Sequence, residues 1–411
     1  MGIALTMAWR NLWRNPRRTW LTVSAIGFVT VLMIFLITIQ LGSYDMIIDS
    51  SLRIFTGQLQ VQRAGYLDKP QIRNSVPDAR GLADRLRALP AFETTGVAVR
   101  AFGFALASSG TRSYGVQVAG VEPRFEPRVS TIPKLIETGR YFDSIDAQEA
   151  VVGATLARNL KLKVGDELTL LGSARDGSVA ATIVPVVGVF RSGVAEVDRH
   201  LVQLPLTTFQ QVFGMGDAAH AIVFLAPNLE ALPVIEREAN ARLPPNQNLV
   251  VLDWNRLVPG LKQLIQADWT TGWFMYVALI LVVTFSILNT FIMSVLERTR
   301  EFGIMLALGT APVRIGVLVV LESALLAAVG LAVGLAIGVS VAFYFYLYGF
   351  TFPGMQELYG QYGLPGVLYP QLSFVSVALG PLVIFGFILL ASLYPTLRIR
   401  RLNAVEAMHA I

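Results

Sequence analysis

The chain has 411 residues, of which 54% are hydrophobic and only 15% are charged, and its formal net charge is +5. Soluble proteins carry roughly 25% charged residues, so this composition, with its apolar residues gathered in long runs, indicates a membrane protein. The absence of cysteine excludes disulfides, thiolate metal sites and a lipid-anchor cysteine, and the three histidines are too few and too scattered to build a metal site.

Residues 1–19 combine tryptophan and arginine at helical spacing. Trp9 and Trp13 are four residues apart, and Arg10 and Arg14 stand beside them. Tryptophan favours the headgroup level of a bilayer and arginine reaches lipid phosphates, so we predict a short interfacial helix on the cytoplasmic surface. The alternative is a disordered basic leader.

Four apolar runs are long enough to cross a bilayer as helices, which takes about 20 residues. Backbone groups must be paired inside lipid, so each run is predicted to be helical. The first run lacks a signal-peptide cleavage site, which favours an uncleaved anchor. The second is longer than a span requires and fits either a stalk that projects from the membrane or a tilted helix. The predicted spans are residues 20–42, 269–296, 313–348 and 372–397.

Arginines in the short connecting segments predict how the spans are oriented. They occur in residues 1–19, in the connection 297–312 and in the tail 398–411, whereas the connection 349–371 contains neither lysine nor arginine. Because basic loops stay in the cytoplasm, we expect both termini to be cytoplasmic and residues 349–371 to be periplasmic. The positive net charge is therefore a topology signal and gives no reason to expect a nucleic-acid partner.

Residues 43–268 are predicted to form a large periplasmic domain inserted between the first and second transmembrane helices. Alternating polar and apolar residues predict a strand at 58–63 and a hairpin over 96–120. Residues 175–178 (Arg-Asp-Gly-Ser) predict the turn of a second hairpin. Together with strand–helix pairs, these patterns predict an α+β fold, which we expect to divide into two lobes near residues 129–139. The strand–helix pairs are predicted at residues 151–160 and 221–243.

The chain carries no recognisable catalytic motif. None of its five lysines follows a glycine, so the phosphate-binding loop G-x-x-x-x-G-K-[ST] is excluded. The serine-nucleophile signature G-x-S-x-G is also absent. We therefore do not expect an enzyme or a cofactor on this chain, and any ATP and Mg²⁺ must bind to another chain.

The connection 297–312 is the most informative segment of the chain. Its first half is charged and its second half has an apolar face. Gly303 and Gly309 permit a neighbouring segment to approach the backbone closely and permit a sharp exit of the chain from this segment. A short amphipathic helix of this kind is suited to a groove on a cytoplasmic partner. On spacing alone, an ordinary interfacial connector fits equally well.

This connection and the helix after it resemble the membrane domain of the FtsX/MacB/Lol family of ABC transporter permeases. The segments that carry the resemblance there are Glu297–Thr310, Glu322, Gly330-x-x-x-Gly334-x-x-x-Gly338 and the closing run from Tyr394-Pro395 to Ala407-Met408. Val151-Val152-Gly153, Val187-Gly188-Val189-Phe190 and Asp253-Trp254 resemble the periplasmic core of the same family. The resemblance covers essentially the whole chain in the order of the family.

The resemblance implies a permease half-transporter in the bacterial inner membrane. Such a chain would pair with a second copy or a paralogue and recruit a soluble ABC ATPase dimer. ATP-driven movement would then pass mechanically through the first two membrane helices to the periplasmic domain. The coupling-helix role would fall to Glu297, Arg298, Arg300, Glu301, Phe302, Gly303, Ile304, Leu306, Ala307, Leu308 and Gly309.

Within the family, the length of the external domain and Asp253-Trp254 are most similar to the Lol permeases, which release lipoproteins. MacB-like efflux of small molecules or peptides and FtsX-like signalling to a periplasmic enzyme are the alternatives. Lol permeases that recruit a chaperone carry a long, proline-containing hook, whereas the hairpin at 171–181 turns tightly and contains no proline. Whether a periplasmic chaperone or another envelope partner docks therefore stays open.

A lipid-anchored substrate would need an apolar cavity at the outer ends of the first two spans. Burying an acyl methylene contributes about 0.8 kcal/mol, so such a cavity needs no polar recognition. The alternative is that these residues face membrane lipid. The residues expected to line the cavity are Ile37, Ile39, Leu41 and Met46 on one side and Trp273, Phe274 and Val277 on the other.

Two further features of the third span have a physical reading. Glu322 is an ionisable residue in a membrane helix, and we expect it to snorkel or to pair with Arg298 or Arg314. The glycines at 330, 334 and 338 lie on one helical face and predict close packing against a neighbouring helix.

Overall fold

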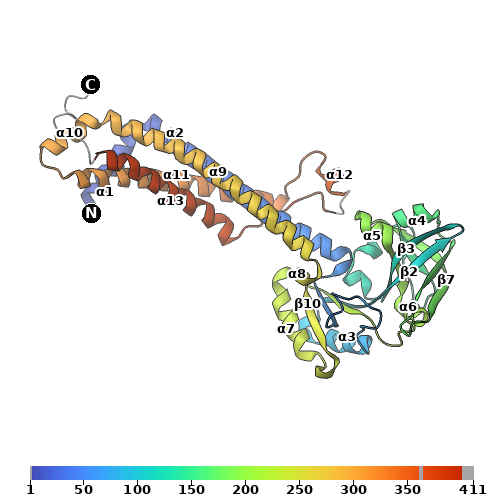
Figure 1. Cartoon of the computed structure of the whole chain (residues 1–411). Helices are drawn as coiled ribbons and strands as arrows, with labels where there is room; N and C mark the ends of the chain where they lie inside the picture. The colour runs from blue at the N-terminus through green and yellow to red at the C-terminus, as the bar shows by residue number, and fades with distance from the viewer. Residues whose placement is uncertain (1, 361–363, 400–411) are drawn as a thin grey trace. The chain divides into compact units, whose positions relative to one another are not determined.

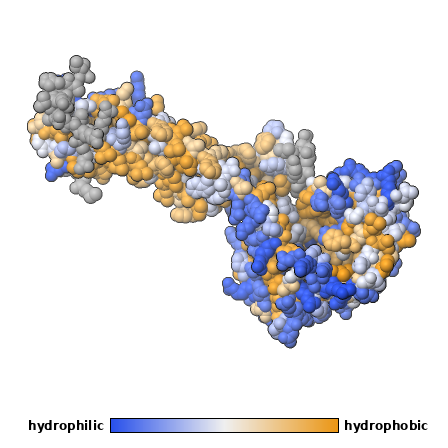
Figure 2. Space-filling model, viewed as in Figure 1, coloured by the Kyte–Doolittle hydropathy of each residue, from blue (hydrophilic) through white to orange (hydrophobic). Residues whose placement is uncertain are grey.

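The computed structural model describes residues 2–360 and 364–399, which fall into two compact units (Figure 1). The membrane unit contains described residues 2–45, 265–352 and 367–399, and the inserted domain contains 46–264 with 353–360 and 364–366. Hydrophobic residues dominate the surface of the long helices and hydrophilic ones the surface of the inserted domain (Figure 2). Most of the predicted tail at 398–411 lies outside the described residues.

In the described chain, four helices are long and apolar enough to cross a membrane, which confirms the four predicted runs. The first and second continue well past the predicted spans, since α2 has 36 residues and α9 has 39, or about 54 and 58 Å of helix. The hydrocarbon core is only about 30 Å thick. The helices of the membrane unit are α1 (Gly2–Arg14), α2 (Pro16–Ser51), α9 (Pro259–Glu297), α10 (Thr299–Ala307), α11 (Pro312–Tyr348) and α13 (Phe374–Ile399).

The predicted glycine face of α11 packs directly on α2. A Cβ atom placed on Gly330 would lie 2.8 Å from Cβ of Ile26, and one on Gly334 would lie 2.6 Å from Cβ of Thr30. Real Cβ atoms do not approach this closely, so only glycine allows this separation of the two backbones. The prediction of close helix packing is confirmed.

All ten strands of the described chain belong to one mixed sheet of the inserted domain. Along the sheet the order is β10-β1-β9-β2-β3-β8-β5-β7-β4, and β6 pairs with both β2 and β7. The strands are β1 (Leu59–Arg63), β2 (Gly96–Ser109), β3 (Arg112–Val121), β4 (Ile136–Gly139), β5 (Ala150–Gly153), β6 (Glu167–Ser173), β7 (Val179–Phe190), β8 (Leu201–Pro205), β9 (Ala221–Leu225) and β10 (Leu249–Asp253). The helices of this domain are α3 (Ala79–Arg87), α4 (Ala154–Leu160), α5 (Ala195–His200), α6 (Leu206–Val212), α7 (Leu232–Arg242), α8 (Trp254–Leu257) and α12 (Met355–Gly360).

Both predicted hairpins are confirmed, as β2–β3 and β6–β7. The expected division into two lobes differs from the structure, because β3, before residues 129–139, and β4, at their end, belong to the same sheet. Between these two strands the sheet is completed by β8, β5 and β7, which come later in the chain. Local sequence patterns do not report such long-range pairing, so the segment between β3 and β4 looked like a boundary.

A buried ion pair fixes the residues that follow α2 to the sheet. Arg100 on β2 donates to Glu126 over 2.7 and 3.1 Å, and both side chains are fully buried. Arg100 also donates to the carbonyl of Phe55, in the turn Leu52–Thr56 that ends α2. The Ser130 hydroxyl donates to the neighbouring carbonyl of Ile54 over 2.7 Å. The end of the first long helix is therefore held by directional bonds.

We expect Gly334→Ala to weaken the contact between α2 and α11. Its methyl group must displace Thr30 or the Gly27 carbonyl, which lies 2.9 Å away, and overpacking of this kind costs about 1–3 kcal/mol. The melting temperature of the purified protein in detergent measures the loss. Gly386→Ala on α13 is the matched control, because nothing lies within 4 Å of its added methyl group. Equal melting temperatures for the two variants would contradict the close contact.

Candidate functional site

The predicted coupling segment forms the short helix α10. It begins after Arg298 and is closed by Gly309, whose φ of +87° favours glycine. Thr310 N–H donates to the Met305 carbonyl and Gly309 N–H donates to the Leu306 carbonyl, both over 3.0 Å. These bonds pair carbonyls that the end of the helix would otherwise leave free. The expected sharp exit at Gly309 is confirmed.

The two faces of α10 differ in exposure. Phe302 is fully buried in a cluster with Val295, Ile315 and Val319, so it seats α10 against α9 and α11. Gly303 is also buried, and Leu306 is half-buried against the same cluster. Ile304 and Leu308 are 48% and 81% exposed, an unusual exposure for aliphatic side chains at adjacent turns of one helix. The exposed residues of the predicted coupling segment are Glu297, Arg300, Glu301, Ile304, Ala307, Leu308 and Gly309.

Arg298 connects α10 with α11. Its guanidinium donates to Glu322 over 2.7 Å and to Glu301 over 3.2 Å, and it lies 5.1 Å from the centroid of the Phe302 ring. The side chains of Arg298 and Glu322 are only 10% and 17% exposed. The predicted pairing of Glu322 with Arg298 is confirmed.

The N-terminal helix also contacts this site, which the sequence did not reveal. Asn11 donates to Glu322 over 2.6 Å, and Arg14 donates to Glu301 over 2.8 and 3.2 Å. Arg18 on α2 donates to Glu297 and to Ser294, each over 2.8 Å. Tryptophan–arginine spacing predicts a surface helix but cannot show which acidic residues, hundreds of positions away, its polar face will meet.

The carboxylate of Glu301 stays charged in this network. Partial burial opposes its ionisation, but hydrogen bonds from Arg14 and Arg298 outweigh that effect and lower its pKa. The pairs Arg14–Glu301 and Arg18–Glu297 are largely solvent-exposed, and such pairs contribute little. Arg298–Glu322 is the most buried ion pair that the described part of this site contains.

The residues expected to line a substrate cavity are only partly brought together. Ile37 is buried, and it meets Trp273 in a cleft of about 10 Å³, which is effectively filled. Phe274 and Val277 are 74% and 40% exposed on α9. Ile39 and Leu41 are half-buried on α2, while Met46 belongs to the inserted domain. The described protomer therefore contains no single cavity formed by this set.

A polar cluster that was not predicted joins α2 to α9 beside that cleft. The Tyr44 hydroxyl donates to Asp268 over 2.5 Å, and Gln40 donates to the same carboxylate over 3.1 Å. The Tyr276 hydroxyl donates to the side-chain oxygen Oε1 of Gln40 over 2.6 Å. Gly272 leaves room for Gln40, since an added Cβ atom would lie 2.8 Å from its Nε2. Gln40 and Tyr276 lie within the predicted spans, and inside lipid such interhelical bonds hold helices together where burial of apolar surface cannot.

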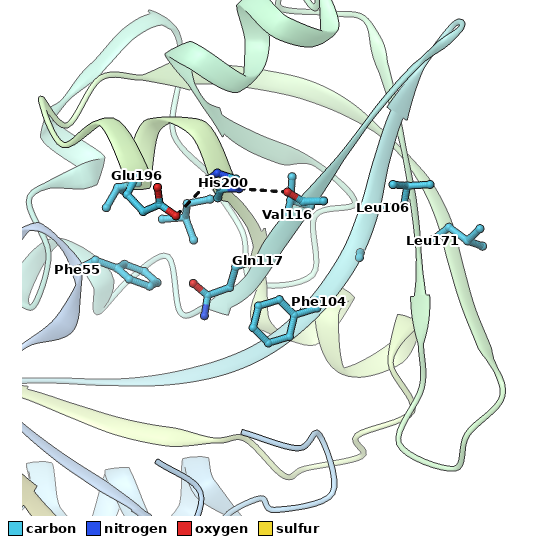
Figure 3. A pocket seen from close by; sticks show the side chains of 12 residues that line it. Phe55, Phe104, Leu106, Val116, Gln117, Leu171, Glu196 and His200 are labelled. Carbon is cyan, nitrogen blue, oxygen red and sulfur yellow. Dashed lines mark hydrogen bonds and ion pairs between the residues drawn. The ribbon is translucent and has the colours of Figure 1, made fainter. Parts of the chain in front are cut away.

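The inserted domain has a cavity of about 500 Å³ that the sequence did not predict (Figure 3). Phe104 and Leu106 line it from β2, and Phe55 lines it from the end of α2. His200 also lines it, with Nδ1 3.3 Å from the Gly115 carbonyl and Nε2 3.8 Å from Glu196. In the described residues, no group of three His, Asp or Glu side chains could hold a metal ion.

Comparison with known proteins identifies the two parts of the chain. Residues 19–242 match the MacB-like periplasmic core domain, and residues 273–404 match the FtsX-like permease C-terminal family. The chain belongs to the FtsX-like ABC permeases with a MacB-like periplasmic core. Permease subunits of this family have no catalytic activity of their own and act with a partner ATPase.

Distant relatives of this FtsX-like permease include subunits of lipoprotein-releasing systems. The transmembrane protein LolC of Neisseria meningitidis serogroup B is 24% identical over 316 residues, which cover 72% of this chain and 73% of LolC. LolE of Haemophilus influenzae is 25% identical over 232 residues, half of each chain. The periplasmic region of MacB from Actinobacillus actinomycetemcomitans is 14% identical, with a TM-score of 0.36 over 52% of this chain and 94% of that one.

We expect Leu308→Ser to remove the ATPase without unfolding the permease. Leu308 is exposed and supports no internal packing, whereas truncation of a central interface residue commonly costs about 2 kcal/mol or more of binding energy. The amount of ATPase retained on the tagged permease in mild detergent measures the effect. Val234→Ser, an exposed apolar residue on α7 of the inserted domain, is the control. Equal ATPase retention by both variants would show that α10 does not dock the ATPase through this residue.

Proposed function

We propose that this permease is the membrane subunit of a mechanotransmitting ABC transporter that extracts or releases a lipidated substrate, with lipoproteins of the inner membrane as the expected class. ATP and Mg²⁺ bind to a separate ATPase dimer, and α10 receives its movement. The observation that carries the proposal is the pair of long helices α2 and α9. They join the network around α10 to the inserted domain by continuous helix.

The contacts at both ends of these helices support a mechanical role. Arg298 and Phe302 seat α10 at the end of α9, and Arg100 and Ser130 hold the turn that follows α2. An α-helix has no soft joint unless its hydrogen-bond ladder is interrupted, and neither α2 nor α9 contains an internal proline. Movement at α10 can therefore pass along the helices to the inserted domain. The basic residues at 1–19 and 297–312 favour the cytoplasm for the α10 end.

The outward face of α9 supports an apolar substrate. Phe274, Val282 and Phe285 are 74%, 70% and 66% exposed. Acyl chains need apolar contact and no polar recognition, with about 0.8 kcal/mol for each methylene buried. Because the described protomer supplies only one wall, a second permease copy or paralogue would complete the predicted cavity. The similarity to LolC and LolE favours lipoproteins as the substrate class.

MacB-like efflux of small molecules or peptides is the second candidate. It is favoured by the match of residues 19–242 to the MacB-like periplasmic core and by the open cavity of the inserted domain. A chaperone that grips a long hook is less well supported. The β6–β7 hairpin closes through residues 174–178, with Gly177 at φ +93°, and leaves no extended loop.

Reconstitution of the permease with its co-purifying ATPase and a triacylated lipoprotein in liposomes tests the proposal. We expect ATP-dependent release of the lipoprotein, and we expect Phe274→Asp to reduce it by about tenfold or more, because a charge on this face opposes acyl burial. ATPase binding should not change. Leu264→Asp is the control, since this residue is 58% exposed on the same helix but lies outside the predicted span.

The outcomes separate the candidates. Normal release by the Phe274 variant would show that this face does not receive the acyl chains. Absence of release by the unaltered protein, with ATP-dependent efflux of a small molecule or peptide instead, would favour the MacB-like function. Neither activity, with binding of a periplasmic enzyme, would favour signalling.

A further inference from the structure

Glu322 is placed where three elements meet. It projects from α11, and each of its two carboxylate oxygens accepts a hydrogen bond from a different part of the chain. Oε1 accepts from Asn11 on α1 over 2.6 Å, and Oε2 accepts from Arg298, directly before α10, over 2.7 Å. The two donors are 311 and 24 positions away in the sequence.

A carboxylate in this position needs a reason. Glu322 interrupts an apolar membrane helix and is only 17% exposed. Desolvation of a charge in this position costs several kcal/mol, which the attraction of an ion partner then offsets. A well-packed apolar residue would often be as stable. What the carboxylate provides instead is directional bonding, because each oxygen holds one donor side chain in a defined position relative to α11.

The other contacts that are described around α10 do not supply a directional bond between α10 and α11. Arg14–Glu301 and Arg18–Glu297 are exposed pairs that connect α1 and α2 with α10 and α9. The contact between α10 and α11 is otherwise the apolar cluster around Phe302. Apolar contacts are non-directional, so Phe302 alone would allow α10 to slide over α11 when pushed.

We propose that Glu322 is a positioning residue that makes α1, α10 and α11 move together when the ATPase displaces α10. It touches neither substrate nor nucleotide and acts through Arg298 and Asn11. The inference rests on the part of the proposed function in which an ATPase acts on α10. It is independent of the lipidated substrate, because it concerns only how movement leaves α10.

The natural chain contains no cysteine, so the movement can be measured directly with spin labels. Arg300→Cys on α10 and Ala332→Cys on α11 are both exposed positions that accept a label. The distance distribution between the labels is recorded for the full protein in nanodiscs with its co-purifying ATPase, without nucleotide and with ATP and vanadate. All further substitutions are made in this labelled background, after it has been shown to bind the ATPase.

With Glu322 in place, we expect one narrow distribution that keeps its centre when ATP and vanadate are added. With Glu322→Gln, the amide cannot hold the guanidinium as an ion pair, and the distribution should broaden and shift on nucleotide binding. Glu137→Gln is the control, because it removes an exposed ion pair, with Arg191, that lies in the inserted domain and outside the predicted coupling segment. It should behave as the unaltered protein.

A charge exchange separates positioning from simple stability. Arg298→Glu alone should release α10, whereas Arg298→Glu with Glu322→Arg rebuilds the pair in reverse and should restore the narrow distribution. In the same variants ATPase binding should persist, while the shift of the inserted domain or the release of substrate for each ATP hydrolysed should fall about tenfold with Glu322→Gln. Asn11→Ala, which removes one donor and no charge, should give a smaller effect.

Two results would overturn the proposal. One is a Glu322→Gln protein whose label distances match the unaltered protein in both nucleotide states. The other is failure of the charge exchange together with loss of ATPase from every Glu322 variant, which would make the pair a structural requirement only. If lipoprotein release is absent from the unaltered protein but the label distances behave as expected, the proposed substrate is wrong and the role of Glu322 stands.

Discussion

Backbone hydrogen bonding inside lipid is the constraint on which the rest of this structure depends. No water is available there to pair a free N–H or carbonyl, so a spanning segment must complete its hydrogen bonds within one helix. α2 and α9 obey this rule over 36 and 39 residues, nearly twice the length that the hydrocarbon core requires. The same unbroken ladder of hydrogen bonds that satisfies the bilayer also makes each helix stiff, and the proposed transfer of movement depends on this stiffness.

Lipid also removes the force that packs helices in water. Apolar side chains gain little by leaving lipid tails for one another, so contact depends on close approach and on a few polar bonds. Both devices occur here. Gly330 and Gly334 bring α11 onto the backbone of α2, and the Tyr276 hydroxyl of α9 donates to the Gln40 side chain of α2. The exposed apolar face of α9, by contrast, has neither device within the described protomer, which is why a second subunit or an acyl chain is a reasonable occupant.

Local sequence patterns predicted the parts of the structure that depend on neighbouring residues. These parts are the four spans, the β2–β3 and β6–β7 hairpins, the glycine face of α11 and the sharp turn at Gly309 that ends α10. They follow from the length of the apolar runs, the alternation of polar and apolar residues and backbone geometry. The insertion of β8 and β5 into the sheet, the contacts of Asn11 and Arg14, and the cavity beside Phe104 depend on residues far apart in the sequence. No periodicity reports them. Glu322 is intermediate, since a buried carboxylate must find a cation and few were available, but its second donor on α1 could not be inferred.

In the proposed mechanism α2 and α9 carry the movement, and an arginine–glutamate pair with little exposure lies near one end of each helix. Arg298–Glu322 lies beside the end of α9, and Arg100–Glu126 holds the turn that follows α2. Neither pair contributes much net stability, because the cost of desolvation offsets most of the electrostatic attraction. Both pairs are directional, however, and movement would be lost if the end of either helix slid over its neighbours. An apolar contact resists separation but not sliding, whereas a charge-assisted hydrogen bond from a guanidinium is directional and resists both. The placement of these pairs therefore fits the transfer of movement better than it fits a demand for stability alone.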